Sequence, residues 1–347
     1  MNSKLPAPHF SFWMPHACLA LVLTLLGLTS CQRDDSGCRP DPAADAPTVP
    51  FRLQRLEQTF LRLKRPAEAQ RFLNQAPLFS RSYLQRRVGT VDSALTRAMV
   101  QMASNPDLQK LGRETTLAFP DTADLRQSLA DAFRRVHYYF PDFKPPLATT
   151  YVSGLLGKDV FVNDSLLVIS LDYFAGPTAS YRPDLPGYML RRYRPAYVLP
   201  TVALRMSDKY NRHEQTANTM LDAMIHSGKA LYFAGQILPC ISDTLLLGYS
   251  GKEFTGAQFN EGKIWGHFLE KNLLYSTTPF LVQKYVAERP NVPEIDRTCP
   301  GRIGQWVGLQ IVRKYMAEHP DVTLARLMAE KNAQMLLNES HYRPKKN

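Results

Sequence analysis

The residues whose types and spacing come closest to a catalytic arrangement are His213 and Glu214, in the run His213-Glu-Gln-Thr-Ala217. In the zinc motif HExxH, two histidines one helical turn apart bind the same ion, and the glutamate activates a water molecule. Ala217 stands where the second histidine is needed, so half of the ligand pair is missing. The run therefore indicates an ordinary helix start rather than a catalytic zinc site.

A second candidate pair is Asp222 with His226, four residues apart on one face of a predicted helix. A carboxylate and an imidazole at this spacing can act as acid and base, but they more often form a surface hydrogen bond. The run Ser207-Asp-Lys209 lacks the Ser-x-x-Lys spacing, and the chain has no Gly-x-Ser-x-Gly elbow. We predict no catalytic residue, no metal ligand and no cofactor.

The N-terminus determines the compartment that we expect. An apolar run, Ala17–Leu26, is too short to cross a bilayer, which needs about 20 apolar residues. It is followed by Gly27-Leu-Thr-Ser-Cys31, which resembles the lipobox of bacterial lipoproteins. That resemblance implies cleavage before Cys31 and attachment of palmitate-type acyl chains to it; the alternative is a secreted protein with an incidental cysteine. Several acyl chains on one residue give stable anchoring.

A polar segment follows the expected anchor. Gln32–Asp35 resembles the short acidic signal that directs some Bacteroidota lipoproteins to the cell surface, although any polar tether can contain such a run. The residues up to Pro50 are rich in proline, alanine and aspartate and lack apolar periodicity. We therefore predict a signal peptide over residues 1–30, a lipidated cysteine with an extended tether over 31–50, and a single folded domain over 51–347.

The five cysteines do not suggest a metal site. Cys18 lies in the signal peptide and Cys31 in the lipobox, which leaves Cys38, Cys240 and Cys299. In an oxidising envelope one pair can form a disulfide. We favour Cys240 with Cys299, because Cys38 lies in the tether.

Composition excludes two broad classes of protein. Hydrophobic residues make up 44% and charged residues 21%, which is typical of a globular protein and not of a disordered chain or a polytopic membrane protein. Lysine and arginine (42) exceed aspartate and glutamate (31), for a net charge of +11. The run Arg191-Arg-Tyr-Arg194 interleaves cations with an aromatic ring, as nucleic-acid surfaces do. Outside the cytoplasm, a solvated face or a contact with another envelope protein is the better interpretation.

Apolar periodicity predicts a mainly helical α+β fold. Leu53, Leu56 and Phe60 recur at helical spacing until Pro66, which should end or kink that helix. Further helices are predicted over 91–99 and 124–140, and then over 201–210, 213–236, 252–274, 279–288, 301–318 and 323–337. Between 148 and 174, β-branched and aromatic residues predict a small antiparallel sheet of two or three strands with a turn at Asn163-Asp-Ser165.

Three sequence blocks together resemble the gliding-motility lipoprotein family of the GldB type. They are Leu171–Gly176 with Tyr188 and Arg191–Pro195, then Met224–Phe233, then Pro300–Gly308, with Leu274–Thr277 between the last two. The resemblance covers about residues 51–330. It implies an envelope lipoprotein of Bacteroidota associated with the gliding motor and the type IX secretion machinery. No catalytic residue is carried over from the family.

A more distant likeness concerns the zinc peptidases of the gluzincin type. In those proteins a helix with Glu-Gly-x-Ala-x-Tyr/Phe supplies the third zinc ligand, and Ser227-Gly-Lys-Ala-Leu-Tyr-Phe233 follows that pattern with serine in place of the glutamate. The preceding helix, Pro200–Tyr210, contains no histidine. The likeness therefore implies a degenerate zincin-like scaffold used for binding. The simpler alternative is that Gly228 lets two helices approach closely, with Tyr232 and Phe233 in the core.

The sequence thus favours a non-enzymatic, lipid-anchored component of the gliding or secretion machinery, located in the cell envelope and expected at the outer membrane. Its expected partners are the membrane, through Cys31, and other envelope proteins, but not nucleic acid. The rival hypothesis is an envelope metal-dependent hydrolase, a peptidase whose non-standard site is assembled from His213, Glu214 and His226. A third class, a carrier of small ligands or lipids, would need a deep apolar pocket, which sequence patterns do not report.

Overall fold

A computed structural model gives the fold, and it describes residues 42–45, 48–86, 92–213 and 218–344. Residues Arg39–Asn347 form one compact unit. The predicted signal peptide, Cys31 and the segment Gln32–Asp35 lie outside the described residues. Part of the predicted tether is folded, since Pro42–Asp45 forms a short 3₁₀ helix that contacts α6 (Ala123–Tyr139) and buries Ala44.

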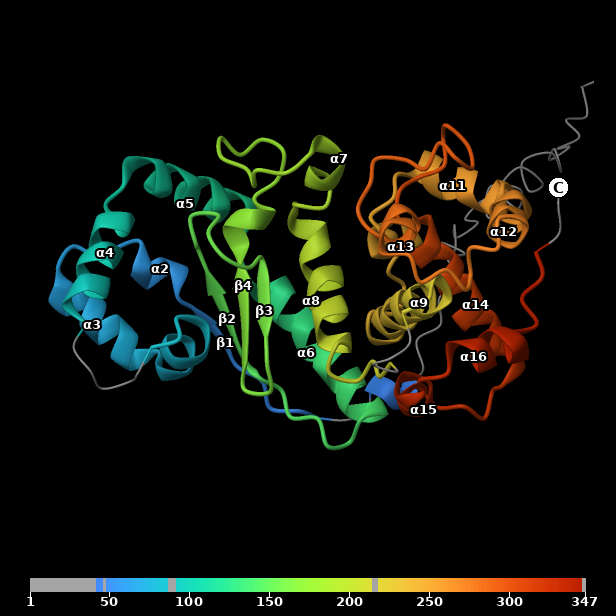
Figure 1. Cartoon of the computed structure of the whole chain (residues 1–347). Coiled ribbons are helices and arrows are strands. Elements are labelled where there is room, and N and C mark those ends of the chain that lie inside the picture. The colour runs from blue at the N-terminus through green and yellow to red at the C-terminus, as the bar shows by residue number, and fades with distance from the viewer. Residues whose placement is uncertain (1–41, 46–47, 87–91, 214–217, 345–347) are drawn as a thin grey trace, which may run out of the picture. The chain divides into compact units, whose positions relative to one another are not determined.

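The described residues are mainly helical, with one small sheet (Figure 1), which confirms the predicted α+β class. The strands are β1 (Leu53–Arg55), β2 (Leu147–Tyr151), β3 (Val160–Val162) and β4 (Leu166–Ser170). The α-helices are α2 (Glu57–Phe60), α3 (Pro66–Gln75), α4 (Ser93–Ala103), α5 (Pro106–Ala118), α6, α7 (Gly187–Leu190), α8 (Val198–Ser207), α9 (Met220–Ile237), α10 (Asp243–Leu247), α11 (Gly251–Phe259), α12 (Glu261–Glu270), α13 (Pro279–Val286), α14 (Ile303–Glu318), α15 (Leu324–Ala329) and α16 (Ala333–Ser340). Short helical turns are η1 (Pro42–Asp45), η2 (Phe79–Tyr83), η3 (Leu171–Phe174) and η4 (Pro195–Tyr197).

The four strands form one mixed sheet in the order β1-β2-β4-β3. β1 pairs with β2 and β2 with β4 in parallel, whereas β3 and β4 form an antiparallel hairpin. The hairpin turn falls where the sequence predicts it, and the Asn163 side chain accepts hydrogen bonds from the N–H groups of Ser165 and Leu166. The prediction of an antiparallel sheet is wrong for the other two pairs. Those strands are joined by long connections, and local patterns do not report such pairing.

The sheet separates two hydrophobic cores, because side chains on a strand alternate between its faces. On one face Leu167 and Ile169 pack with α6 and α8; on the other, Leu166 and Val168 pack with α3, α4 and η2. Figure 1 shows α3 and α4 on one side of the sheet and α6 and α8 on the other. The first core continues beyond α8 into the C-terminal helices, with α8 contacting α9. α8 therefore lies between the sheet and the second half of the unit.

Helix boundaries differ from the sequence predictions where a cap or a strand pairing decides them. The predicted first helix begins instead as β1, and the N–H of Leu56 donates to the Thr150 carbonyl oxygen (3.0 Å). Pro66 starts α3 rather than ending a helix, because its missing N–H costs nothing at a first helical position. The helix predicted from residue 213 starts at Met220, where Thr219 and Asp222 form a capping box. The helix predicted over 252–274 is interrupted at Asn260, whereas α6 confirms its prediction within one residue.

Helices α9 and α14 approach each other closely through two glycines. A Cβ atom on Gly228 would lie 2.3 Å from the carbonyl of Gly308, and one on Gly308 would lie 1.8 Å from the Met224 carbonyl oxygen. The prediction that Gly228 permits a close approach of two helices is confirmed. Phe233 is fully buried, as expected, whereas Tyr232 is only half-buried.

Candidate functional site

A cavity of about 400 Å³ lies between α8 and the helices α9, α10 and α14. We call it the arginine cavity, because its lining is rich in charged side chains with three arginines among them. The charged lining residues are Asp159, Arg192, Arg205, Asp208, Glu288 and Arg302. Positive and negative groups are equal in number, so the cavity is polar without a net charge.

Arg302 is the most constrained member of the arginine cavity. Its backbone is left-handed (φ 58°), a conformation that costs free energy for any residue but glycine and often marks a functional site. The preceding Gly301 cannot carry a side chain, since a Cβ atom there would lie 1.9 Å from the Arg289 carbonyl oxygen. The two residues together turn the chain into α14 and place a buried guanidinium, only 8% exposed as a residue, at the cavity wall.

The Arg302 guanidinium is held by the end of α10 and the segment that follows it. One of its terminal nitrogens donates to the Leu247 carbonyl oxygen, and the group lies 5.9 Å from the ring centroid of Tyr249. The Tyr249 hydroxyl donates in turn to the Gly301 carbonyl oxygen (2.9 Å). Burial, and secondarily the charge of Arg192, lowers the pKa of Arg302. Its orientation is therefore fixed before any ligand arrives.

Glu288 is shared by two arginines. Its Oε1 lies 2.8 Å from Arg192 Nη1 and 3.6 Å from Arg302 Nε. Arginine stays protonated throughout the physiological pH range and binds carboxylate and phosphate groups through a planar fork of donors. An anionic group entering the cavity would compete with Glu288 for the more accessible Arg192.

On the opposite wall, Asp159 accepts a hydrogen bond from the Tyr193 hydroxyl (3.3 Å) and lies 3.8 Å from Arg205. Burial, with the Asp159 charge as a second cause, raises the pKa of Tyr193 to about 12, so its hydroxyl stays neutral at physiological pH. The Tyr193 hydroxyl and the Arg205 guanidinium can donate hydrogen bonds to a ligand. Burial raises the pKa of the Asp208 carboxyl, which lines the same cavity.

The sequence blocks that are far apart in the chain meet at this cavity. The first block contributes Arg192 and Tyr193, the second contributes Ala230 on α9, and the third contributes Arg302 and Gln305. The α9–α14 glycine contact brings the second and third blocks together. Asp172 of the first block has a structural role, since its buried carboxylate accepts hydrogen bonds from the N–H groups of Ser153 and Leu155.

The model of a protein family described as gliding motility protein GldB matches residues 37–344. The chain belongs to the GldB family. No curated protein and no solved structure matches it. Membership in the GldB family makes this a gliding motility-associated lipoprotein with a membrane-associated place in the cell envelope. No helix within the described parts of the chain is long and apolar enough to cross a membrane.

The structure brings together only part of the histidine site that the sequence suggested for this GldB family member. His213 precedes α9, and its ring lies 5.0 Å from that of His226 (centroid to centroid). Burial lowers the pKa of His226, with His213 as the next cause. Glu214 lies outside the described residues. Across the described part of the chain, no group of three or more His, Cys, Asp or Glu side chains is placed to hold a metal ion.

Other candidate side chains are used to hold the fold together. The Asp222 carboxylate accepts hydrogen bonds from the N–H and hydroxyl of Thr219 at the start of α9. The Ser227 hydroxyl, at the place of the gluzincin glutamate, donates to the Ala223 carbonyl oxygen (2.9 Å). No solved structure matches the GldB chain, so its likeness to gluzincin peptidases stays a prediction.

Cysteine pairing differs from the prediction. Cys299 is a buried free thiol, and burial raises its pKa to about 12. Cys240 is disulfide-bonded, but not to Cys299. The favoured Cys240–Cys299 pair is therefore wrong, because Cys299 is enclosed in the core as a free thiol.

The arginine run 191–194 is not simply a solvated face. Arg191 pairs with Glu253 (2.5 Å) and Arg192 with Glu288, so the fold uses two of its cations internally. The sequence reasoning missed Glu288, Asp159 and Tyr249 as members of the site. Their positions in the chain carry no local pattern, and only the Gly301-Arg302 step within the third block signals an unusual backbone.

Proposed function

We propose that this GldB family member is a non-catalytic, lipid-anchored binding component of the Bacteroidota gliding and type IX secretion machinery. The anchor would be Cys31 and the membrane the outer membrane. The observation that supports a binding role best is the arginine cavity, where residues of all three sequence blocks form a fixed, charged lining. Arginines already oriented by Glu288, Leu247 and Tyr249 are suited to recognition of an anionic group on a partner.

The test is a crosslinked pull-down of the tagged protein from intact cells, comparing Arg192→Ala with Arg182→Ala. Arg192 is the better variant, because its side chain is more exposed than that of Arg302, which stays within 3.6 Å of Glu288. Arg182 is an exposed arginine that does not line the cavity, and it matches the change in charge. We expect recovery of a specific partner to fall about fivefold or more for Arg192→Ala, as for an interface arginine, and to be unchanged for Arg182→Ala. Equal recovery with both variants would contradict the role of the cavity.

A second candidate is the envelope hydrolase, favoured by the approach of His213 to His226. The two proposals differ in the metal content of the full-length protein purified in detergent and in complementation of a null strain. Under the non-catalytic proposal, His213→Ala and His226→Ala restore the phenotype, and zinc is not stoichiometric by mass spectrometry. Stoichiometric zinc that disappears in His213→Ala together with function would establish the hydrolase.

A further inference from the structure

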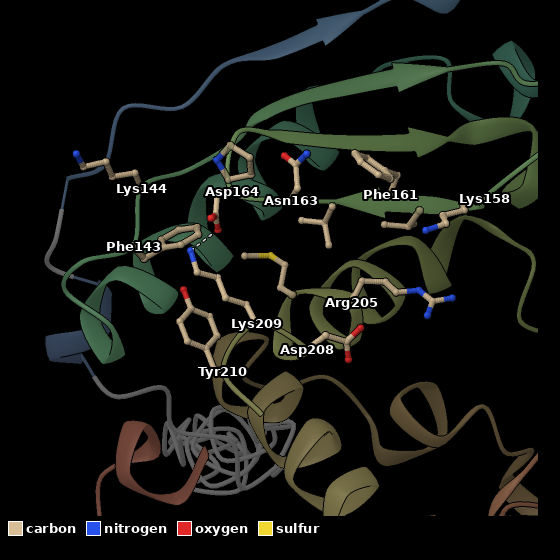
Figure 2. Close-up of a pocket in the computed structure, with 14 residues that line it drawn as sticks. Phe143, Lys144, Lys158, Phe161, Asn163, Asp164, Arg205, Asp208, Lys209 and Tyr210 are labelled. Carbon is tan, nitrogen blue, oxygen red and sulfur yellow. Dashed lines mark hydrogen bonds and ion pairs between the residues drawn. The ribbon is translucent and has the colours of Figure 1, made fainter. Parts of the chain in front are cut away.

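A second hollow, of about 450 Å³, lies on the other side of α8, between its C-terminal end and strand β3. We call it the edge groove. The connection between α6 and β2 closes one end with Phe143 and Lys144 (Figure 2). The residues that line the edge groove belong to none of the three sequence blocks. Arg205 and Asp208 are the two described residues that line both hollows.

The edge groove opens onto the free edge of the sheet. β3 is the last strand in the order β1-β2-β4-β3. Phe161 points to the face of the sheet opposite to that of Val160 and Val162, yet all three line the groove. Side chains of both faces can line one hollow only if it extends around the edge of the strand.

The backbone of β3 presents unused hydrogen-bonding groups to this groove. On the β4 side, Asn163 N–H donates to Leu166 O and Ser170 N–H donates to Asp159 O (both 2.9 Å). By the alternation of an antiparallel pair, the peptide groups of Val160 and Val162 then face away from β4. The Asp159 carboxylate accepts from the N–H of Val160 (2.7 Å). Among the described residues, no hydrogen bond uses the N–H or C=O of Val162, which leaves both groups to an incoming strand.

The charges around the edge groove are unbalanced. Four cations line it (Lys144, Lys158, Arg205 and Lys209), against the carboxylates of Asp164 and Asp208. Lys209 pairs with Asp164 (2.5 Å), and Arg205 lies near Asp159. For Lys144 and Lys158, no carboxylate within the described ranges lies at ion-pair distance. Figure 2 shows these two lysines at opposite ends of the groove.

The floor between the two lysines is apolar. Met206 and Phe143 are 5% and 6% exposed, and Val160 is 2% exposed. A strand that lies along β3 would place one apolar side chain over this floor and neighbouring polar side chains near the lysines. The groove thus combines a strand edge, an apolar contact and a basic rim, which is the arrangement used for peptide recognition by strand addition.

We propose that the edge groove binds an extended, acidic segment of a partner polypeptide as a fifth strand beside β3. The main chain of the segment would hydrogen-bond to Val162, and its carboxylates would pair with Lys144 and Lys158. The proposal rests on the proposed binding role and adds the chemistry of a partner. An anionic lipid is the weaker candidate, because a lipid has no main chain to pair with the N–H and C=O of Val162.

The test uses the full-length protein in detergent and a fluorescent peptide that alternates glutamate with valine, with a lysine–valine peptide for comparison. Binding is measured by fluorescence anisotropy. We expect the acidic peptide to bind at least about tenfold more tightly, and Lys144→Glu with Lys158→Glu to remove about tenfold of that affinity. The matched control is Lys252→Glu with Lys271→Glu, which makes the same charge change at exposed positions outside the groove.

A backbone variant tests the strand geometry. Val162→Pro removes only an N–H that faces away from β4, a position that tolerates proline on edge strands, and it should weaken acidic-peptide binding about fivefold. Val162→Thr keeps the N–H and should bind as wild type. If Val162→Pro does not fold, the lysine variants decide the question, since they change only exposed groups.

Three results would overturn the proposal: equal binding of both peptides, unchanged binding by the double lysine variant, or a preference for phosphatidylglycerol over phosphatidylcholine vesicles that the acidic peptide does not abolish. The comparison of the two lipids removes the contribution of the acyl anchor, which is the same for both vesicles. The last result would assign the groove to lipid. If the peptide-binding test fails but Arg192→Ala still lowers partner recovery in the pull-down, the proposed function stands without the edge groove. If Arg192→Ala does not lower partner recovery, the proposed function itself is contradicted.

Discussion

Lys229 is a buried cation that joins three segments of the chain. Its ammonium group donates hydrogen bonds to the carbonyl oxygens of Arg212 (2.6 Å), Met328 (3.3 Å) and Glu330 (2.6 Å). It thereby ties α9 to the segment after α8 and to the end of α15. Burial lowers the pKa of Lys229 to about 8, although the charge of Glu330 partly opposes this. A sequence pattern that marked this lysine as the variable position of a peptidase motif could not reveal a structural role.

The lowered pKa of Lys229 predicts a pH dependence of stability. From about pH 8 up to the ordinary lysine pKa, the unfolded chain binds a proton that the folded chain lacks, so the free energy of unfolding rises with pH. Lys229→Met removes this dependence and leaves the carbonyl oxygens of Arg212 and Glu330 without the lysine donor, whereas that of Met328 keeps the Arg212 N–H (2.9 Å). The cost is about 1–3 kcal/mol for each group left unsatisfied. We expect Lys229→Met to have a lower free energy of unfolding than wild type, and this difference to grow between about pH 7.5 and 9.5.

Urea unfolding of both proteins at the two pH values measures that deficit. Tyrosines whose pKa is raised by burial also affect stability in alkali, but they are common to both proteins and cancel in the difference. A deficit that stays constant or shrinks with rising pH would show that Lys229 is charged in the folded protein at both values.

Two residues show what the sequence could and could not indicate at this scale. Asn163 was correctly placed in a turn, because an asparagine side chain can bond to the backbone two residues ahead. Arg302 lies in the third family block, but its left-handed backbone and its burial do not follow from its residue type. Both depend on contacts with Leu247 and Tyr249, which lie more than fifty positions away.

Among the elements, the pair α9 and α14 is the one whose contact depends most on single residues. Gly308→Ala would place a methyl group 1.8 Å from the Met224 carbonyl oxygen, which belongs to the backbone of α9 and cannot rotate away. The two helices would have to separate, at a cost of about 1–3 kcal/mol or more. Gly256→Ala in α11 is the matched control. Nothing lies within 4 Å of its new Cβ atom, so the higher helix propensity of alanine should stabilise the protein by about 0.5–1 kcal/mol.

Chemical denaturation followed by tryptophan fluorescence distinguishes the two glycine variants, because Trp306 is buried on α14 next to this contact. The expected shifts of the unfolding midpoint have opposite signs. If Gly308→Ala were neutral, the close approach of α9 and α14 would not be needed for stability, and the arginine cavity that depends on it would lose its structural basis.

Long elements with a clear period were predictable from sequence, whereas short ones and their pairing were not. The seventeen residues of α6 follow a regular apolar stripe, so their prediction is confirmed. β1 has only three residues, and its apolar spacing also fits a helix; its pairing with β2, about ninety positions away, decides the outcome. The arginine cavity combines segments that are similarly distant in the chain. Local sequence patterns therefore do not predict that Glu288 and Asp159 belong to it.

For the whole molecule, the two hollows on either side of α8 are the two binding surfaces that we propose. The arginine cavity is balanced in charge and built from buried, oriented groups, whereas the edge groove is basic and offers backbone donors and acceptors. Arg205 and Asp208 at the end of α8 line both hollows, so a ligand in one can influence the other through these side chains. A component that connects partners at an envelope surface would use both surfaces at once.

Such a role depends on where the molecule is held, and Cys31, outside the described residues, is the expected point of attachment. The thiol of Cys31 is needed both for acylation and for recognition by the lipoprotein signal peptidase, as its resemblance to a lipobox implies. We therefore expect Cys31→Ala to abolish incorporation of a palmitate analogue during metabolic labelling and to leave an uncleaved or mislocalised precursor. Cys299→Ala is the control, because that thiol is buried and free in the folded unit and should not affect labelling. Unchanged labelling of Cys31→Ala would exclude lipid attachment at this residue. The two binding surfaces would then have to reach the membrane through a partner, and the acidic segment proposed for the edge groove would be the first contact to examine.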